Sequence, residues 1–244
     1  MQRYFLDTEI NKEVTITGDD FHHIKNVMRM REEHKVSICD FNGNCYLCSL
    51  KNYLDKSVIF EVLDKIEESN ELSANIYLAC GLLKGDKLEY VIQKATELGV
   101  SKIIPLSLKR NIVKLDSKKE LKKITRWNKI AKEAAEQSKR NKIPEIKSVM
   151  TLQELTKIDA DYKFVAYEET SHTQKLFSRL QNVTKSDIII LVVGPEGGLD
   201  IKEVEQLRAG DFTDVSLGKR ILRAETACIH SVGVIAAYID YLGC

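Results

Sequence analysis

The chain has 244 residues, enough for one large domain or two modest ones with a buried core. Its 37 basic and 36 acidic side chains nearly cancel, which excludes nucleic-acid binding through overall positive charge, so any such surface must come from local segregation. No apolar run is long enough to span a bilayer, and the N-terminus lacks the apolar core of a signal peptide. We therefore expect a cytoplasmic protein with no membrane association, whose six cysteines are reduced.

The first part of the chain shows short alternating strands. They are expected at residues 13–17, 35–40, 44–50 and 57–62, with one helical segment around 20–30. Several short strands separated by turn signals predict a small barrel or sandwich. A polar stretch at 65–71 ends this pattern, so we place a first domain at residues 1–70.

Cys45 and Cys48 form a CxxC pair that must be weighed against metal or redox use. They lie on the second arm of a predicted hairpin whose turn is Asn42-Gly43. Positions three apart on a strand point to opposite faces, so the two thiols diverge. With no second CxxC, we predict small packed thiols and no metal site.

From about Ser73 the pattern changes to alternating strands and helices, which defines a second domain at 73–244. A strand at 75–83 is followed by a helix at 85–98, with Gly99 as its stop signal, and by a strand at 102–106. Further strands are expected at 163–167, 188–193 and 214–217. This alternation predicts an α/β fold with a mostly parallel sheet covered by helices.

The segment 117–142 carries ten basic and only three acidic residues. Apolar residues at helical spacing give it an inward stripe, so it is expected to form an amphipathic helix with a basic outer face. Such a face is either simply solvated or contacts the phosphates of a nucleic acid, and charge alone leaves both interpretations open.

A buried-strand run at 188–193 stops in the glycine-rich loop Gly194-Pro195-Glu196-Gly197-Gly198. Open α/β sheets place ligands at such strand ends, and glycines let backbone groups approach a ligand closely. The alternative is a tight strand-to-helix turn with Asp200 capping the helix that follows. The chain has neither a P-loop nor a GxGxxG turn, so phosphate-binding fingerprints are absent from it.

The stretch Leu217–Ala227 places Arg220, Arg223 and Glu225 at the start of a helix that is expected to run to about Leu242. This helix is apolar on nearly every side, which is typical of a helix that is buried all round or shared with another subunit. We therefore expect a homodimer formed through it.

The two C-terminal motifs, in this order and this close to the chain end, resemble those of the RsmE family of RNA methyltransferases. Three further stretches match motifs of that family: Lys84–Lys87 with Gln93–Gly99, Glu133–Arg140, and His22-His23 with Val27 and Arg29. The resemblance therefore covers nearly the whole chain. It departs at 106–110, where a more polar, serine- and arginine-rich stretch is expected, so it assigns no substrate contacts to the 106–116 loop.

The resemblance implies a SPOUT-type methyltransferase domain with a C-terminal trefoil knot, preceded by a PUA-like RNA-binding barrel. It implies S-adenosylmethionine as cofactor and N3 of a uridine in 16S ribosomal RNA of the small ribosomal subunit as the methylated site. The cofactor-binding residues implied are Tyr167, Glu168, Gly194, Pro195, Glu196, Gly197, Gly198, Leu217, Gly218, Ile221 and Leu222.

Within this family-based hypothesis, Arg223 is expected to stabilise negative charge on a uracil carbonyl. Glu225 is expected either to accept the proton or to orient the arginine, and a plain ion pair at the helix start is the alternative for both. The sequence identifies no general base. The side chains expected to bind RNA are Lys25, Arg29, Arg31, Lys122, Lys123, Arg126, Lys139 and Arg140.

Two functions of other classes compete with this one. A non-catalytic RNA-binding ribosome assembly factor would use the barrel and the basic helix without any cofactor. A nucleotide-binding hydrolase is disfavoured because the chain lacks a P-loop.

Overall fold

The computed structural model describes residues 1–241. The chain divides into two compact units. The smaller unit comprises Met1–Glu71 together with Ala135–Ile143, and the larger unit comprises Leu72–Ala134 together with the chain from Pro144 onward. The nine residues 135–143 join the smaller unit although they are distant from it in sequence, which the compositional pattern did not predict.

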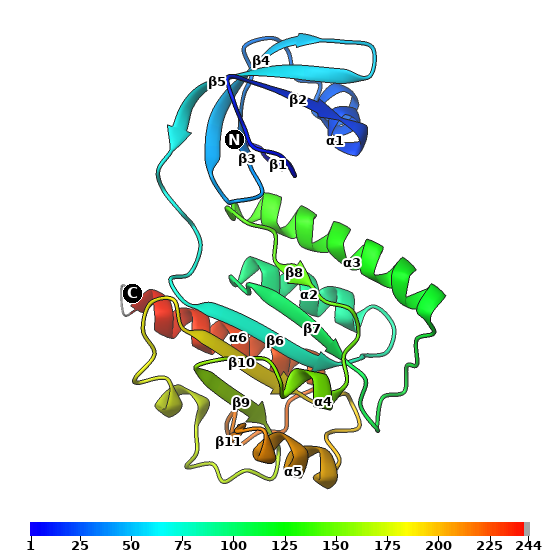
Figure 1. The fold of residues 1–244 in the computed structure, drawn as a ribbon, viewed down its shortest axis with the longest axis vertical. Coiled ribbons are helices and arrows are strands. Elements are labelled where there is room, and N and C mark those ends of the chain that lie inside the picture. The colour runs from blue at the N-terminus through cyan, green and yellow to red at the C-terminus, as the bar shows by residue number, and fades with distance from the viewer. Residues whose placement is uncertain (242–244) are drawn as a thin grey trace. The chain divides into compact units, whose positions relative to one another are not determined.

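The smaller unit is built on a five-stranded sheet with the order β1-β3-β4-β5-β2 (Figure 1). Alternation in β2 buries Val14 and Ile16 and exposes the residues between them, as the period of a strand requires. The predicted strands are confirmed, whereas β1 was not predicted because three residues show no period. The bounds are β1 (Arg3–Phe5), β2 (Glu13–Thr17), α1 (Gly18–His22), the π-helical turn η1 (His23–Val27), β3 (Lys35–Cys39), β4 (Cys45–Tyr53) and β5 (Ser57–Ile66).

The cysteines of this sheet correct one expectation. Cys39 and Cys45 lie opposite each other on β3 and β4 and form a disulfide, so the prediction of six reduced cysteines is wrong for these two. The hairpin connection brings them face to face, and linear spacing does not reveal such pairing. Cys45 and Cys48 pack in different hydrophobic clusters, as predicted. Burial raises the pKa of the Cys48 thiol to about 12.

The larger unit contains a six-stranded sheet, with the order β11-β9-β10-β6-β7-β8, in which every neighbouring pair is parallel. Helices cover both faces of this sheet, so the central strand β10 is apolar throughout, which explains the continuous run Ile188–Val193. The strands are β6 (Asn75–Gly81), β7 (Lys102–Leu106), β8 (Glu145–Ile146), β9 (Tyr162–Ala166), β10 (Ile188–Val193) and β11 (Thr213–Val215).

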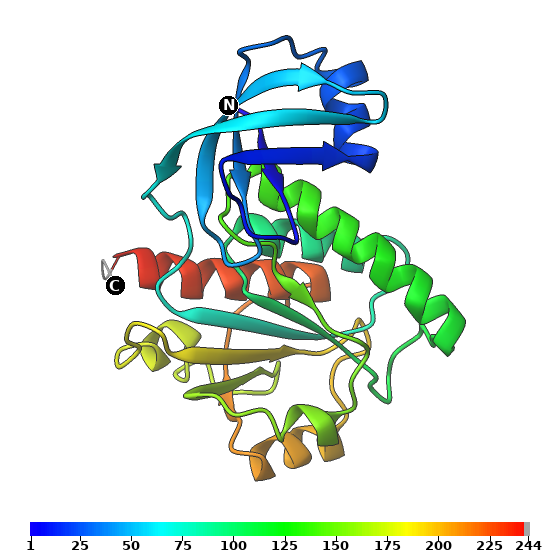
Figure 2. The same ribbon diagram turned by 45° about the horizontal axis from the view of Figure 1, so that its top comes forward.

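The two faces of the larger sheet carry different helices. On one face, α2 (Lys87–Glu97) and α6 (Ala224–Tyr241) pack together, and α6 lies against β6 and β10 (Figures 1 and 2). On the other, α4 (Leu152–Leu155) and α5 (Ile201–Ala209) share a core with alternate residues of β10, Ile190 and Val192. The mixed α/β fold with helices on both faces is therefore confirmed.

Two further helices complete the element order. The predicted basic helix is α3 (Ser117–Gln137), and a short 3-10 helix, η2 (Leu176–Arg179), precedes β10. The predicted end of the last helix, Leu242, lies outside the described residues. Within residues 1–241, no helix combines the length and the apolar character that a membrane span needs.

Candidate functional site

A pocket of about 320 Å³ opens where β9, β10 and β11 end. The residues that directly follow each of these strands line the pocket. They lie close together because the carboxyl ends of parallel strands meet at one edge of the sheet. The pocket is lined by Lys87, Ala166, Tyr167, Glu168, His172, Val193, Gly194, Pro195, Glu196, Gly198, Val215, Ser216, Leu217, Gly218, Arg220, Ile221, Leu222, Arg223, Ala224 and Ala227.

The two loops that the sequence singled out thus meet at one pocket. Every residue expected to bind the cofactor lines it except Gly197, whose carbonyl instead accepts a hydrogen bond from Nη1 of Arg110 at 3.1 Å. Arg220 and Arg223 line the pocket with exposed side chains. Sequence reasoning missed several small or apolar lining residues at strand ends, and it missed His172 and Ser216, which no motif marks.

Backbone conformation and close packing both favour small residues around the 194–198 loop. Gly198 has φ +70°, and a Cβ there would lie 2.6 Å from Oε1 of Glu168. A Cβ on Gly81, at the end of β6, would lie 2.7 Å from the backbone nitrogen of Pro195. The loop also ends as the simpler interpretation predicts, because Asp200 caps α5 in a capping box with Glu203. The turn and the pocket wall are therefore the same structure.

Charged side chains gather at one side of this pocket. Glu196 accepts hydrogen bonds at Oε1 from the backbone N–H of Lys84 at 3.0 Å and from Nζ of Lys87 at 3.2 Å. Burial opposes ionisation of Glu196, but these donors and its own backbone N–H outweigh that effect and lower the pKa below its ordinary value. Lys87 also pairs with Oε2 of Glu225 at 3.5 Å. Glu225, at the start of α6, therefore pairs with Lys87. From the sequence, this glutamate was expected to orient Arg223 or to accept the proton.

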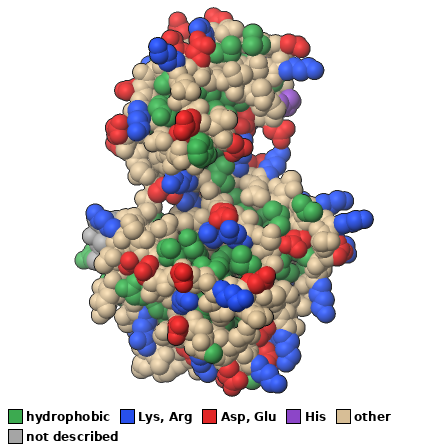
Figure 3. All heavy atoms as spheres, viewed as in Figure 1, with side chains coloured by type: hydrophobic (Ala, Val, Ile, Leu, Met, Phe, Trp, Pro, Cys, Tyr) green, Lys and Arg blue, Asp and Glu red, His purple; other side chains and the backbone are tan. Residues whose placement is uncertain are grey.

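The first half of α3 presents most of its basic side chains to solvent, and Figure 3 shows Lys and Arg side chains along the edge that α3 occupies. Lys118 and Lys122 are exposed. Lys123 and Arg126, also predicted to bind RNA, form ion pairs with Glu89 on α2, and the Arg126 side chain stays largely exposed.

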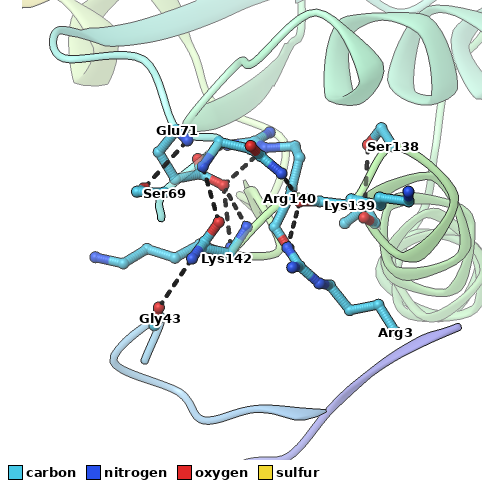
Figure 4. A network of polar contacts seen from close by, with 11 residues as sticks. Arg3, Gly43, Ser69, Glu71, Ser138, Lys139, Arg140 and Lys142 are labelled. Carbon is cyan, nitrogen blue, oxygen red and sulfur yellow. Dashed lines mark hydrogen bonds and ion pairs between the residues drawn. The ribbon is translucent and has the colours of Figure 1, made fainter. Parts of the chain in front are cut away.

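Arg140 requires a correction. Its side chain is only 3% exposed, and its guanidinium pairs with Glu71, so it offers no surface to a phosphate (Figure 4). Arg3 donates from Nη1 to the Arg140 carbonyl at 2.8 Å, which ties this segment to β1. Lys139 differs: its backbone is left-handed, with φ +58°, and the residue is exposed. Sequence reasoning could not separate these neighbours because both are simply cations.

The smaller unit carries the other predicted RNA-binding cations. Lys25, in η1, lies over the rings of Phe21 and Tyr53, with Nζ 5.2 and 5.8 Å from the ring centroids. Arg29 and Arg31 follow this turn, and both are exposed. Three cations therefore stand at or just after one π-helical turn.

Comparison with known proteins agrees with this geometry. A family model described as an RNA methyltransferase domain matches residues 70–236, and one described as an RNA methyltransferase PUA domain matches residues 16–63. The chain is 43% identical to ribosomal RNA small subunit methyltransferase E of Bacillus subtilis, with 99% of this chain and 98% of that protein covered. It is 34% identical to the protein of the same name from Mesomycoplasma hyopneumoniae, with 94% and 96% covered.

Solved structures give the same result. The crystal structure of ribosomal RNA small subunit methyltransferase E from Neisseria gonorrhoeae, bound to S-adenosyl methionine, superposes with a TM-score of 0.85 at 30% identity and 96% coverage of both chains. The near-complete coverage means that both units, and not the pocket alone, are shared. The chain belongs to the ribosomal RNA small subunit methyltransferase E family.

Proposed function

We propose that the chain transfers the methyl group of S-adenosylmethionine to N3 of a uridine in 16S ribosomal RNA. The observation that carries this proposal is the single pocket formed by the two motif loops at the ends of β9, β10 and β11. A relative of the same fold, from Neisseria gonorrhoeae, is described as bound to this cofactor, and the curated relatives are named as methyltransferases of small-subunit ribosomal RNA.

The pocket fits the cofactor chemically. Its volume of about 320 Å³ lies in the range of small-molecule sites. S-adenosylmethionine has no phosphate, and the chain accordingly offers backbone groups of a glycine loop in place of a phosphate-binding turn. Apolar walls from Val193, Val215 and Leu222 suit the flat adenine ring. When bound, the cofactor supplies a methyl group on a positively charged sulfur.

The side chains of the chain must favour the deprotonated uracil, since N3 of uridine normally carries a proton. Arg223, at the pocket wall, is the cation that would stabilise negative charge on a uracil carbonyl. Glu225 pairs with Lys87, which supports a role in holding the site over a role as proton acceptor. Alignment of the two reactants supplies the rest, and good positioning contributes roughly 7–11 kcal/mol in the best intramolecular cases.

RNA docking is assigned to residues that do not line the pocket. The exposed lysines of α3 and the cations of the smaller unit, Lys25, Arg29 and Arg31, provide positive charge that attracts phosphates without reading sequence. The match of residues 16–63 to a PUA domain of RNA methyltransferases supports this division. Because ribosomal RNA is its substrate, the enzyme is expected to work in the cytoplasm.

The proposal includes a homodimer formed through α6. One side of this helix is buried, whereas Thr226, His230 and Ala237 lie on an accessible stripe with the half-buried Gly233 and Val234. The same stripe on a second copy of the chain can pack against it, and burial of so few polar groups costs little desolvation free energy. The C-terminal trefoil knot stays a prediction of the family resemblance.

The deciding experiment combines the purified chain, S-adenosylmethionine and small ribosomal subunits from a strain lacking this protein. Mass spectrometry of the RNA nucleosides should show 3-methyluridine only when protein and cofactor are both present. Subunits from the parent strain should accept no further methyl group, because the site is already modified. A non-catalytic assembly factor would bind the subunits and leave the nucleosides unchanged, and that result would overturn the proposal.

A further inference from the structure

Lys87, the last residue of the Lys84–Lys87 motif, lies between two acidic side chains of the pocket region. Its Nζ is 3.2 Å from Oε1 of Glu196 and 3.5 Å from Oε2 of Glu225. Lys87 begins α2, Glu196 belongs to the loop after β10, and Glu225 lies in the first turn of α6. One ammonium group therefore connects the glycine loop, the helix start that follows Arg223, and a third segment distant from both in sequence.

Lys87 supplies a counter-charge to both carboxylates, and Glu196 also accepts a hydrogen bond from the backbone N–H of Lys84. The side chains of Glu196 and Glu225 are only 20% and 16% exposed. In both, Oε2 is buried and accepts no hydrogen bond among the described residues. A partly buried carboxylate that loses its counter-charge is costly, and two of them near one another repel. Removal of the ammonium should therefore drive the two carboxylates toward solvent and away from each other.

The glycine loop has little freedom to absorb such a movement. The backbone of Pro195 lies against Gly81 closely enough that a Cβ there would clash at 2.7 Å. Glu196 Oε1 accepts hydrogen bonds from the backbone N–H of Lys84 and from Nζ of Lys87. The first and the last residue of the Lys84–Lys87 motif therefore both hold the glycine loop through this carboxylate. A shift of Glu196 consequently moves the wall on which the cofactor would rest.

We propose that Lys87 is a positioning residue, which holds the Gly194–Gly198 loop and the start of α6 in the geometry that binds S-adenosylmethionine. The inference rests on the proposed function and gives the Lys84–Lys87 motif a role in it. Lys87 acts through Glu196 and Glu225, so contact with the cofactor is not required. The same ion pairs fix the helix start from which Arg223 reaches the pocket.

The first test is titration calorimetry of S-adenosylmethionine into the full chain and its variants, well below their melting temperatures. Lys87→Met should weaken binding at least tenfold, and Lys87→Arg should recover most of the affinity because it restores the charge. Lys94→Met is the matched control: Lys94 lies on the same helix and pairs with Glu97 at 2.8 Å, but it does not line the pocket. Its affinity should equal that of the parent chain.

A double-mutant cycle separates positioning from direct contact. If Lys87 acts through Glu196, Glu196→Gln should also weaken binding, and the double variant should be hardly weaker than Lys87→Met alone. If Glu196→Gln and Glu225→Gln both bind normally while Lys87→Met does not, the lysine acts through neither carboxylate, and the positioning role is overturned. Fully additive losses would overturn it as well.

Hydrogen exchange supplies a readout without any cofactor. The backbone amide of Lys84 donates to Glu196, so it should exchange faster in Lys87→Met and at the parent rate in Lys94→Met. Unchanged exchange, or unchanged affinity in Lys87→Met, would refute the inference. Failure of the proposed function is a different result, since the parent chain itself would then bind no S-adenosylmethionine.

Discussion

Lys123 donates a hydrogen bond from Nζ to Oε1 of Glu89 at 2.9 Å, joining α3 to α2 within the larger unit. Arg126 completes the pair with a bond from Nε to Oε2 at 2.8 Å. The side chain of Glu89 is only 7% exposed, so these two cations neutralise a buried charge. Two of the side chains expected to bind RNA therefore also hold the fold, and their replacement would not test RNA binding alone.

The first prediction concerns pH. Burial opposes ionisation of Glu89, but Lys123 and Arg126 outweigh that effect and lower its pKa. A carboxylate whose pKa is lower in the folded state than in the unfolded state stabilises the fold at any pH above its unfolded-state pKa. This stability is lost as the pH falls through the folded-state pKa. Glu89→Gln should thus reduce the free energy of unfolding by about 1–3 kcal/mol at pH 7, and the difference should shrink below about pH 4.5. Urea unfolding followed by fluorescence of Trp127 measures this, and a difference independent of pH would contradict it.

RNA docking is best tested at Lys118 and Lys122, which are exposed. Lys118→Gln with Lys122→Gln should weaken RNA binding and flatten its salt dependence by about 0.7–0.9 in slope for each lost phosphate contact, because fewer counterions are released. Affinity for S-adenosylmethionine should not change. Lys202→Gln, an exposed lysine of α5, serves as the control. An unaltered slope would mean that α3 is merely solvated, and Lys25, Arg29 and Arg31 would be the next candidates.

A glycine substitution tests the cofactor loop. Gly198→Ala brings a Cβ to 2.6 Å from Oε1 of Glu168 and should weaken S-adenosylmethionine binding severalfold or more. Gly18→Ala is the matched control, since Gly18 has nearly the same left-handed φ of +65° but no atom within 4 Å of the added Cβ. Both variants should lose about 1–2 kcal/mol of stability to backbone strain. Equal cofactor affinity in the two, measured by calorimetry, would remove the loop from the site.

Arg223→Ala should lower kcat about 100-fold or more, while affinity for S-adenosylmethionine stays within a few-fold of the parent value. The rate and the cofactor affinity separate because Arg223 would stabilise negative charge, which develops on the uracil during the reaction and does not develop on the cofactor in the binding step. Arg223→Lys should retain part of the rate because it keeps a cation. Lys219→Ala removes a nearby exposed cation that does not line the pocket, and it should have no effect on kcat. Equal losses in both alanine variants would point to a non-specific charge effect.

Assembly is tested on the accessible stripe of α6. Light scattering of the parent chain should give twice the monomer mass of 27.8 kDa. Ala237→Arg places a long charged side chain on the stripe and should yield the monomer, whereas Ala237→Ser should remain dimeric. A parent chain that is already monomeric at micromolar concentration would rule out the homodimer.

The sequence by itself determined the longer elements and the location of the pocket loops, whereas short ones such as β1, β8 and α4 were not predicted. Period two marked β2 and helical spacing marked α2, while continuous apolar residues marked β10, because burial imposes these patterns locally. The glycines after β10 also predicted the loop from the sequence alone, because a backbone that approaches its neighbours closely leaves no room for side chains. The family resemblance added the cofactor and the substrate, which no periodicity contains.

Only the tertiary structure decided which charged side chains are available. Arg140 and Lys139 are adjacent cations, yet one is buried against Glu71 and the other is exposed. Lys87 meets Glu196 and Glu225 because α2, the loop after β10 and α6 converge, and Cys39 meets Cys45 because β3 and β4 pair in one register. Such contacts depend on the order and register of strands, which are set by the packing of the whole sheet and leave no local signal in the sequence.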